Sequence, residues 1–168
     1  MLKLIILLIL GGTVCSLVIA APALELSSKG KTNYKIVFDK ANSIPSENTA
    51  VNELKNYLGK LTKANFPLVS TLNTTGKIIV IGRNKLSENF LGCKLIKKLG
   101  AEEFIIKSSK NGNIYIVGGR PRGTLYGVYH FLDNILGVRW VAPGVEFVPN
   151  KPNLKISALD VHEKPAYN

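Results

Sequence analysis

A glycine-rich stretch that leads into a helical pattern constrains the fold more than any other part of the sequence. Residues 113–117 (NIYIV) form a strand-like run, residues 118–123 (GGRPRG) supply the glycines, and apolar side chains then recur at helical spacing as far as Leu136. Gly137 follows at a position where glycine commonly caps a helix. This order predicts a strand that turns tightly into a helix over about residues 124–135.

The same glycines also invite a comparison with phosphate-binding loops, which lie between a strand and a helix N-terminus. The stretch has no Gly-Lys-Ser or Gly-Lys-Thr ending, and its glycine spacing does not match the dinucleotide-binding fingerprint. We therefore attribute the glycines to close packing of the helix on the sheet. Arg120 and Arg122 could each bind a carboxylate or a phosphate through two hydrogen bonds, or lie exposed, or pair with a neighbouring domain.

Strand and helix patterns elsewhere point to a small fold of mixed secondary structure. A period-two pattern over residues 34–39 predicts a first strand, and the apolar run at residues 77–81 predicts a buried one. Apolar side chains at helical spacing over residues 50–61 predict the first long helix. Pro45 opens this helix, and Ser46 is its expected N-cap.

Asn111-Gly112 lies between two strand-like runs, residues 103–108 and 113–117, and predicts a β-hairpin. Weaker patterns predict a short helix or irregular segment and three short extended runs, at residues 87–99, 66–69, 145–148 and 154–156. The predicted fold class is therefore α/β (α+β), with a small mixed β-sheet and two main helices packed on one of its faces.

Residues 1–23 have the three-part pattern of a secretory signal peptide. Lys3 precedes an unbroken apolar run, and small residues surround plausible cleavage points after Ala20 and Ala23. An uncleaved membrane anchor is the alternative, since the apolar character lasts for nearly the ~20 residues that cross a bilayer. The small residues favour cleavage, so we expect a secreted or periplasmic protein without membrane contact after cleavage. A lipid anchor on Cys15 is disfavoured because Val14 precedes it.

Cleavage would leave Cys93 as the only cysteine, which excludes an internal disulfide and a two-cysteine metal site. Cys93 is expected to be a small core residue. The formal net charge of the whole chain is +11, which could indicate an anionic partner. The lysines are scattered, however, and no nucleic-acid recognition motif is present. We expect a basic surface and no nucleic-acid partner.

The residues that usually carry catalysis show no convergent pattern. His130 and His162 are the only histidines, and neither has a second ligand at metal spacing, so no metal and no cofactor are expected. Glycosidases need two carboxyl groups about 5–9.5 Å apart. The acidic candidates lie on separate predicted elements and are expected to be solvated surface groups: Glu102, Glu103, Asp133 and Glu146.

Arg139 and Trp140, directly after the second helix, are the candidate substrate-binding residues. The only tryptophan of the chain could stack on a sugar ring while Arg139 pairs with a carboxylate. A lone tryptophan is more often a core or domain-interface anchor. We favour the interface interpretation and keep sugar binding as the alternative.

Several of these segments resemble the N-terminal domain of α-glucuronidases, of bacterial β-N-acetylhexosaminidases and of their uncharacterised relatives. The resemblance covers about residues 33–165. Lys63 departs from the pattern, because relatives often have a glycine where the first helix ends. The segments that carry the resemblance are residues 118–129 (GGRPRGTLYGVY), 131–132 (FL) and 136–144 (LGVRWVAPG), with support from 50–58 (AVNELKNYL) and 77–82 (KIIVIG).

In such enzymes this domain is an accessory α/β unit beside a (β/α)8 barrel, and the barrel carries the catalytic carboxylates. The resemblance implies an accessory domain over residues 24–160, with residues 161–168 as the start of a linker to the barrel, its partner, which is absent here. No catalytic residue can be carried over, so the chain alone is not expected to be active.

We therefore expect the exported, non-catalytic N-terminal domain of a glycoside hydrolase that takes part in polysaccharide degradation, as a fragment that stops before the barrel. The alternative is a free-standing secreted module that binds a glycan or a protein through the surface around Arg139 and Trp140. An autonomous enzyme is disfavoured because no site for one is present.

Overall fold

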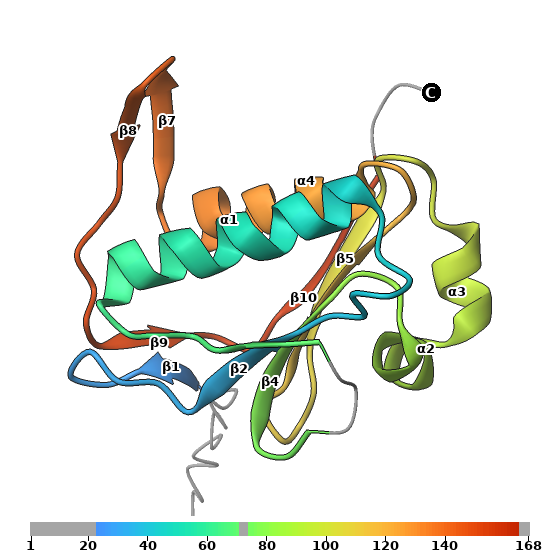
Figure 1. Ribbon diagram of the computed structural model, residues 1–168, viewed down its shortest axis with the longest axis horizontal. Coiled ribbons are helices and arrows are strands. Elements are labelled where there is room, and N and C mark those ends of the chain that lie inside the picture. The colour runs from blue at the N-terminus through green and yellow to red at the C-terminus, as the bar shows by residue number, and fades with distance from the viewer. Residues whose placement is uncertain (1–22, 71–73, 165–168) are drawn as a thin grey trace, which may run out of the picture.

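A mixed six-stranded sheet forms the centre of the computed structural model, which describes residues 23–70 and 74–164 (Figure 1). The strand order is β10-β5-β6-β4-β2-β3, with β3, β2, β4 and β6 parallel to one another and β5 and β10 antiparallel to their neighbours. Its strands are β2 (Tyr34–Val37), β3 (Leu68–Val69), β4 (Lys77–Ile81), β5 (Phe104–Ser108), β6 (Ile114–Gly118) and β10 (Asp160–Glu163).

Two long helices cover one face of this sheet, and two short helices cover the other. The larger core lies under α1 (Pro45–Thr62) and α4 (Gly123–His130), and α2 (Lys85–Leu91) and α3 (Cys93–Lys98) pack against the opposite face. The predicted fold class is thus confirmed, with the two main helices on one side (Figure 1). The short helix or irregular segment expected at residues 87–99 is helical and divides into α2 and α3. Cys93 on α3 is only partly buried and is not the core residue that was expected.

Strand β4 shows why the sheet needs cover on both faces. Ile79 and Ile81 point into the larger core, whereas Ile78 and Val80 point into the smaller one. Successive side chains of a strand face opposite ways, so a continuous apolar run marks a strand that is buried on both sides. The predicted hairpin is also present, with β5 and β6 paired from Phe104–Gly118 to Ser108–Ile114.

The glycine-rich turn between β6 and α4 packs as the sequence predicts. A Cβ atom on Gly118 would overlap the backbone of Gly123, and one on Gly119 would overlap the carbonyl of Gly100. The buried Thr124 hydroxyl accepts a hydrogen bond from the Gly118 N–H at 3.0 Å and closes the turn. The glycines therefore permit a close approach of backbone to backbone.

Two details of the helices differ from the prediction: the N-cap of the first helix and the regularity of the second. Ile44, not Ser46, is the N-cap of α1, because the fixed φ of Pro45 suits the first helical position. The Ser46 hydroxyl instead donates to the Pro121 carbonyl. At its other end α1 stops at Lys63, which adopts the left-handed conformation (φ 63°) that glycine favours. The second helix is also not uniform: α4 continues as a π-helix, η1 (Phe131–Ile135), before Gly137 (φ 85°) ends it as predicted.

Four strands lie outside the main sheet and form two small pairs. β1 (Leu24–Ser27) pairs with β9 (Leu154–Ile156), and β7 (Arg139–Ala142) pairs with β8 (Val145–Phe147), all antiparallel. At the C-terminal end β10 pairs with β5 as far as Glu163, so the domain boundary expected at residue 160 falls inside a strand of the main sheet. The expected signal peptide lies almost entirely in residues 1–22, which are outside the described residues. Residues 165–168 of the expected linker are outside them as well. Among residues 23–70 and 74–164, no helix is long and apolar enough to span a bilayer.

Candidate functional site

The β7–β8 hairpin carries both predicted binding residues and stands apart from the rest of the fold. It rises past the helix layer, away from the main sheet (Figure 1). Every residue of the two strands is exposed, and Trp140 faces Glu146 across the ladder. An isolated two-stranded hairpin is at best marginally stable in water, so the hairpin needs an attachment to the helices.

Trp140 provides that attachment. Its indole Nε1 donates a hydrogen bond to the Tyr57 hydroxyl at 2.9 Å. The ring meets Tyr57 of α1 edge-on, with centroids 5.3 Å apart, and Tyr129 of α4 in the same way at 5.2 Å. Edge-to-face contacts of this kind stabilise aromatic clusters by about 0.5–1.5 kcal/mol per pair beyond area burial. Trp140 thus joins the hairpin to both long helices while 40% of its surface stays exposed.

Glu146 fixes the hairpin from the second strand. Its carboxylate accepts a hydrogen bond from the Tyr57 hydroxyl and pairs with Lys60 at 2.6 Å. Lys60 and then Tyr57, as hydrogen-bond donors, lower the pKa of Glu146. Burial, followed by the bond to Glu146, raises the pKa of Tyr57, and the bond to Glu146 raises that of Lys60. The group is therefore a charged attachment to α1 and not a free carboxylate.

Arg139 points away from Trp140. Its Nη1 donates to the Asp133 carbonyl at 2.6 Å and also pairs with the Asp133 carboxylate. Neighbouring residues of a strand face opposite sides, so the guanidinium and the indole are directed at different partners. The structure does not bring the two predicted binding residues to one point, and binding of a glycan by either stays a prediction.

The other predicted acidic candidates also have partners of their own. Glu102 pairs with Arg122, and the Glu103 carboxylate lies 2.7 Å from His162 Nε2. The Gly100 N–H and then His162 lower the pKa of Glu103. His130 is partly buried, and its ring packs on Phe104 with centroids 5.2 Å apart. Within the described ranges, no three metal-ligating side chains gather at one place.

Glu47 is a buried carboxylate that the sequence analysis did not single out as a site residue. Arg120 binds it through Nε at 3.3 Å and Nη2 at 2.9 Å, and the Glu47 side chain is only 4% exposed. Glu47 also accepts the Ile44 N–H at 3.1 Å, which closes the first turn of α1. Of the roles open to Arg120, binding a carboxylate is the one observed. The pair joins α1 to the glycine-rich turn, and only the position of Glu47 in the first helical turn hinted at it.

The tip and outer side of the hairpin expose an apolar patch. Val141 is 72% exposed, Val145 55% and Phe147 60%. We call these three side chains the hairpin patch. Exposed apolar side chains that gather on one short hairpin are typical of a site that another protein surface covers.

Comparison with known proteins agrees with this architecture. Residues 22–131 match the family model described as "Glycosyl hydrolase family 67 N-terminus". No curated protein matches the chain. The resemblance to the N-terminal domain of glycoside hydrolases is thereby confirmed at the level of the family.

Two solved structures share the fold. A family GH115 4-O-methyl-α-glucuronidase with specificity for decorated arabinogalactans is 20% identical, with a TM-score of 0.63 over 86% of this chain and 18% of that one. The Streptomyces plicatus N-acetyl-β-hexosaminidase, in complex with Thio-NAglucal, is 13% identical, with a TM-score of 0.50 over 88% of this chain and 24% of that one. The chain therefore spans less than a quarter of the length of either enzyme.

Proposed function

The chain belongs to the family of glycosyl hydrolase family 67 N-terminal domains, and from this we propose that it is the non-catalytic N-terminal domain of a secreted glycoside hydrolase that degrades polysaccharide. Four acidic groups that could have served catalysis, Glu102, Glu103, Asp133 and Glu146, each have a basic partner in the same domain. The chain spans 18% of the α-glucuronidase and 24% of the hexosaminidase that share its fold, which supports a role beside a larger catalytic domain.

The observation that carries the proposal is the hairpin patch. Val141, Val145 and Phe147 are exposed in the domain, whereas Trp140 is held against two tyrosines behind them. Fixing the backbone while exposing apolar side chains prepares a surface for docking, because little conformational entropy is then lost on association. The surface that covers the patch is, in this proposal, the catalytic (β/α)8 barrel.

A binding experiment with the separately produced barrel tests the docking. The coding sequence beyond Asn168 is read first, since the proposal requires a barrel there. The chain is then titrated with that barrel by calorimetry, as the natural sequence and as Val141→Lys/Phe147→Lys. Leu95→Lys is the matched control, because Leu95 is an equally apolar residue, 41% exposed, on α3 at the opposite face of the sheet. Loss of binding in the hairpin variant alone supports the proposal, and equal binding by all three proteins contradicts it.

Export is the part of the proposal that the leader sequence supports. N-terminal sequencing of the protein recovered outside the cytoplasm should begin after Ala20 or Ala23. Recovery of the intact N-terminus in the membrane fraction would instead favour an anchor.

A free-standing glycan-binding module is the alternative, with Trp140 as the stacking residue. The partly exposed indole is the observation in its favour. Titration with uronic-acid and N-acetylhexosamine oligosaccharides, followed by Trp140 fluorescence, tests this function directly. A saturable change in the natural chain, together with binding that calorimetry detects in the natural chain and not in Trp140→Phe, would support it; no fluorescence change, or equal calorimetric binding by both proteins, would reject it.

A further inference from the structure

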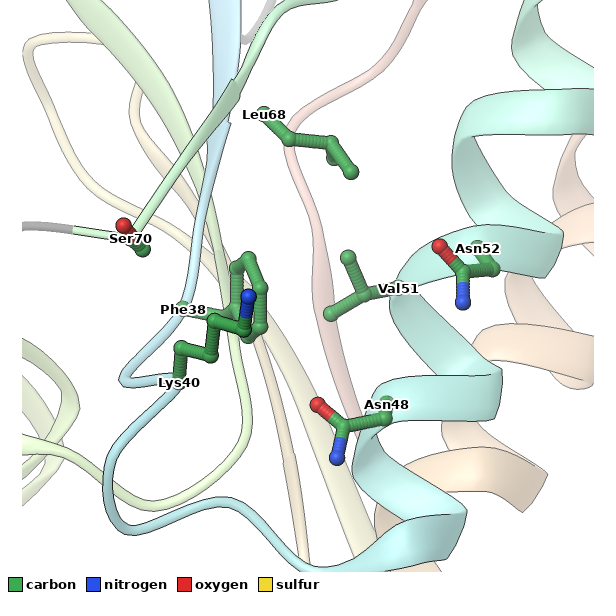
Figure 2. A pocket seen from close by; sticks show the side chains of 7 residues that line it. All are labelled: Phe38, Lys40, Asn48, Val51, Asn52, Leu68 and Ser70. Carbon is green, nitrogen blue, oxygen red and sulfur yellow. The ribbon is translucent and has the colours of Figure 1, made fainter.

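Two hollows lie side by side along the edge of α1, far from the hairpin patch in sequence. The first, about 500 Å³, opens between α1 and the ends of β2 and β3 (Figure 2). The second, about 430 Å³, lies between α1 and the segment that follows it. Asn52 lines both, so the two hollows adjoin at this side chain, and we call the pair the groove along α1. Each has the size of an ordinary small-ligand site.

Three asparagines at a spacing of four residues give this groove its character. Asn48, Asn52 and Asn56 line it in succession, and residues four apart lie on the same face of a helix. Figure 2 shows the first two reaching from α1 into the hollow. The Asn48 side-chain oxygen accepts the Ser43 hydroxyl at 2.8 Å. Among the described residues, neither Asn52 nor Asn56 makes a side-chain hydrogen bond, so both amides can donate to and accept from a ligand.

The floor and the charge of the groove narrow the class of ligand. Phe38, Val51 and Leu68 form an apolar floor in the first hollow (Figure 2). Lys40 and Lys55 line the two hollows, whereas none of the residues that line either of them is acidic. Lys60 also borders the second hollow but is engaged by Glu146. The groove thus offers paired amide groups, an apolar surface and positive charge.

We propose that the groove along α1 binds an acidic oligosaccharide. The Asn52 and Asn56 amides form hydrogen bonds with adjacent sugar hydroxyls, and the apolar floor packs against the C–H face of a sugar ring. Lys40 and Lys55 pair with the carboxylates of the oligosaccharide. Nucleic acid is the less suitable occupant, because no arginine lines the groove and arginine is the residue best matched to phosphate. The choice of a glycan over another acidic polymer rests on the proposed function, but the site does not depend on docking of the hairpin patch.

Titration of the full chain with tetragalacturonic acid, followed by NMR of the asparagine side-chain amides, tests the site. Maltotetraose serves as the uncharged probe and an eight-residue thymidine oligonucleotide as the nucleic-acid probe. Asn52→Asp places a negative charge where the two hollows meet, and Asn52→Ala removes the amide at an exposed helical position where alanine preserves folding. Asn111→Asp, in the β5–β6 turn at the other end of the sheet, makes the same charge change and is the control.

The proposal predicts saturable shifts of Asn48, Asn52 and Asn56 with tetragalacturonic acid and weaker or no shifts with maltotetraose. Asn52→Asp should raise the dissociation constant about fivefold or more, as the loss of one hydrogen bond and added repulsion require, with Asn111→Asp unchanged. Absence of saturable shifts, equal weakening in both aspartate variants, equal affinity for the neutral sugar, or tighter binding of the oligonucleotide would each overturn it. These results are independent of the barrel titration, so failure of one proposal is distinct from failure of the other.

Discussion

Removal of the Arg120 side chain is the sharpest test of how the glycine-rich turn is held to α1. Arg120→Met keeps an unbranched apolar stem but removes the guanidinium that is hydrogen-bonded to the buried Glu47 carboxylate. Glu47 is 4% exposed and Arg120 37%, so the carboxylate is the desolvated member of the pair. Breaking a fully buried pair costs about 3–5 kcal/mol. Because Arg120 is partly solvated, we expect a loss of about 2–4 kcal/mol of folding free energy, and a fall in Tm of roughly 5–10 °C.

Three further variants separate the ion pair from general damage to the turn. Glu47→Gln keeps an oxygen that can accept the Ile44 N–H, and in combination with Arg120→Met it removes both charges of the Glu47–Arg120 pair. The double variant should therefore be less destabilised than the sum of the two single ones, by about 1–2 kcal/mol. Arg122→Met in the same turn removes a surface pair with Glu102 and should cost at most about 1 kcal/mol.

Urea unfolding followed by far-ultraviolet circular dichroism measures all four variants, because that signal reports the helices and not the hairpin alone. Additive effects in the double variant, or a loss in Arg120→Met no larger than in Arg122→Met, would refute the assignment of Glu47 and Arg120 as a coupled buried pair. The turn would then be held by backbone packing only.

Three other variants test single features of the fold. Lys63→Gly should raise the unfolding free energy by about 0.5–1 kcal/mol, because Lys63 holds the left-handed conformation (φ 63°) in which only glycine avoids strain; an unchanged urea midpoint would argue against strain there. Gly119→Ala should lower it by about 3 kcal/mol or more, because the added Cβ would overlap the Gly100 carbonyl. Glu103 has a pKa held below 4.5 in the folded state by the Gly100 N–H and by His162, so its contribution is present above pH 4.5 and is lost as the pH falls through the folded pKa. In Glu103→Gln the unfolding free energy should therefore fall less steeply at acidic pH than in the natural chain. An equally steep fall in both proteins would contradict this.

The parts of the fold that sequence patterns predicted are those whose signal is local. Asn111-Gly112 fixed the β5–β6 hairpin because the turn and both strands lie within fifteen residues. The β1–β9 pair could not be predicted in the same way, because Glu25 pairs with Lys155, which is far along the chain. For β8, only a weak extended run at residues 145–148 was predicted, and β7 was not predicted at all, because the residues of both strands are exposed and no period-two burial pattern marks them.

In the candidate site, too, the local features could be predicted and the long-range contacts could not. The sequence singled out Trp140 because it is the only tryptophan, but its partners could not be foreseen. Tyr57 comes from a helix 83 residues earlier, and it binds both Trp140 and Glu146. Glu146 had been expected to be a solvated surface group, since nothing in its neighbourhood in the sequence indicates a partner. Long-range contacts decide the chemistry of both residues, and no local pattern encodes them.

The arrangement around Trp140 bears directly on the choice between an interface and a sugar platform. A platform needs an open ring face and neighbouring groups that remain free to bond hydroxyls. Here the indole N–H is used by Tyr57, the adjacent carboxylate of Glu146 is used by Tyr57 and Lys60, and Arg139 is directed at Asp133. The side chains left without such partners on the hairpin are the apolar Val141, Val145 and Phe147, which suit another protein surface better than a glycan. The free amides that a sugar would require lie instead on α1, so the two functions that the sequence assigned to one surface separate onto two.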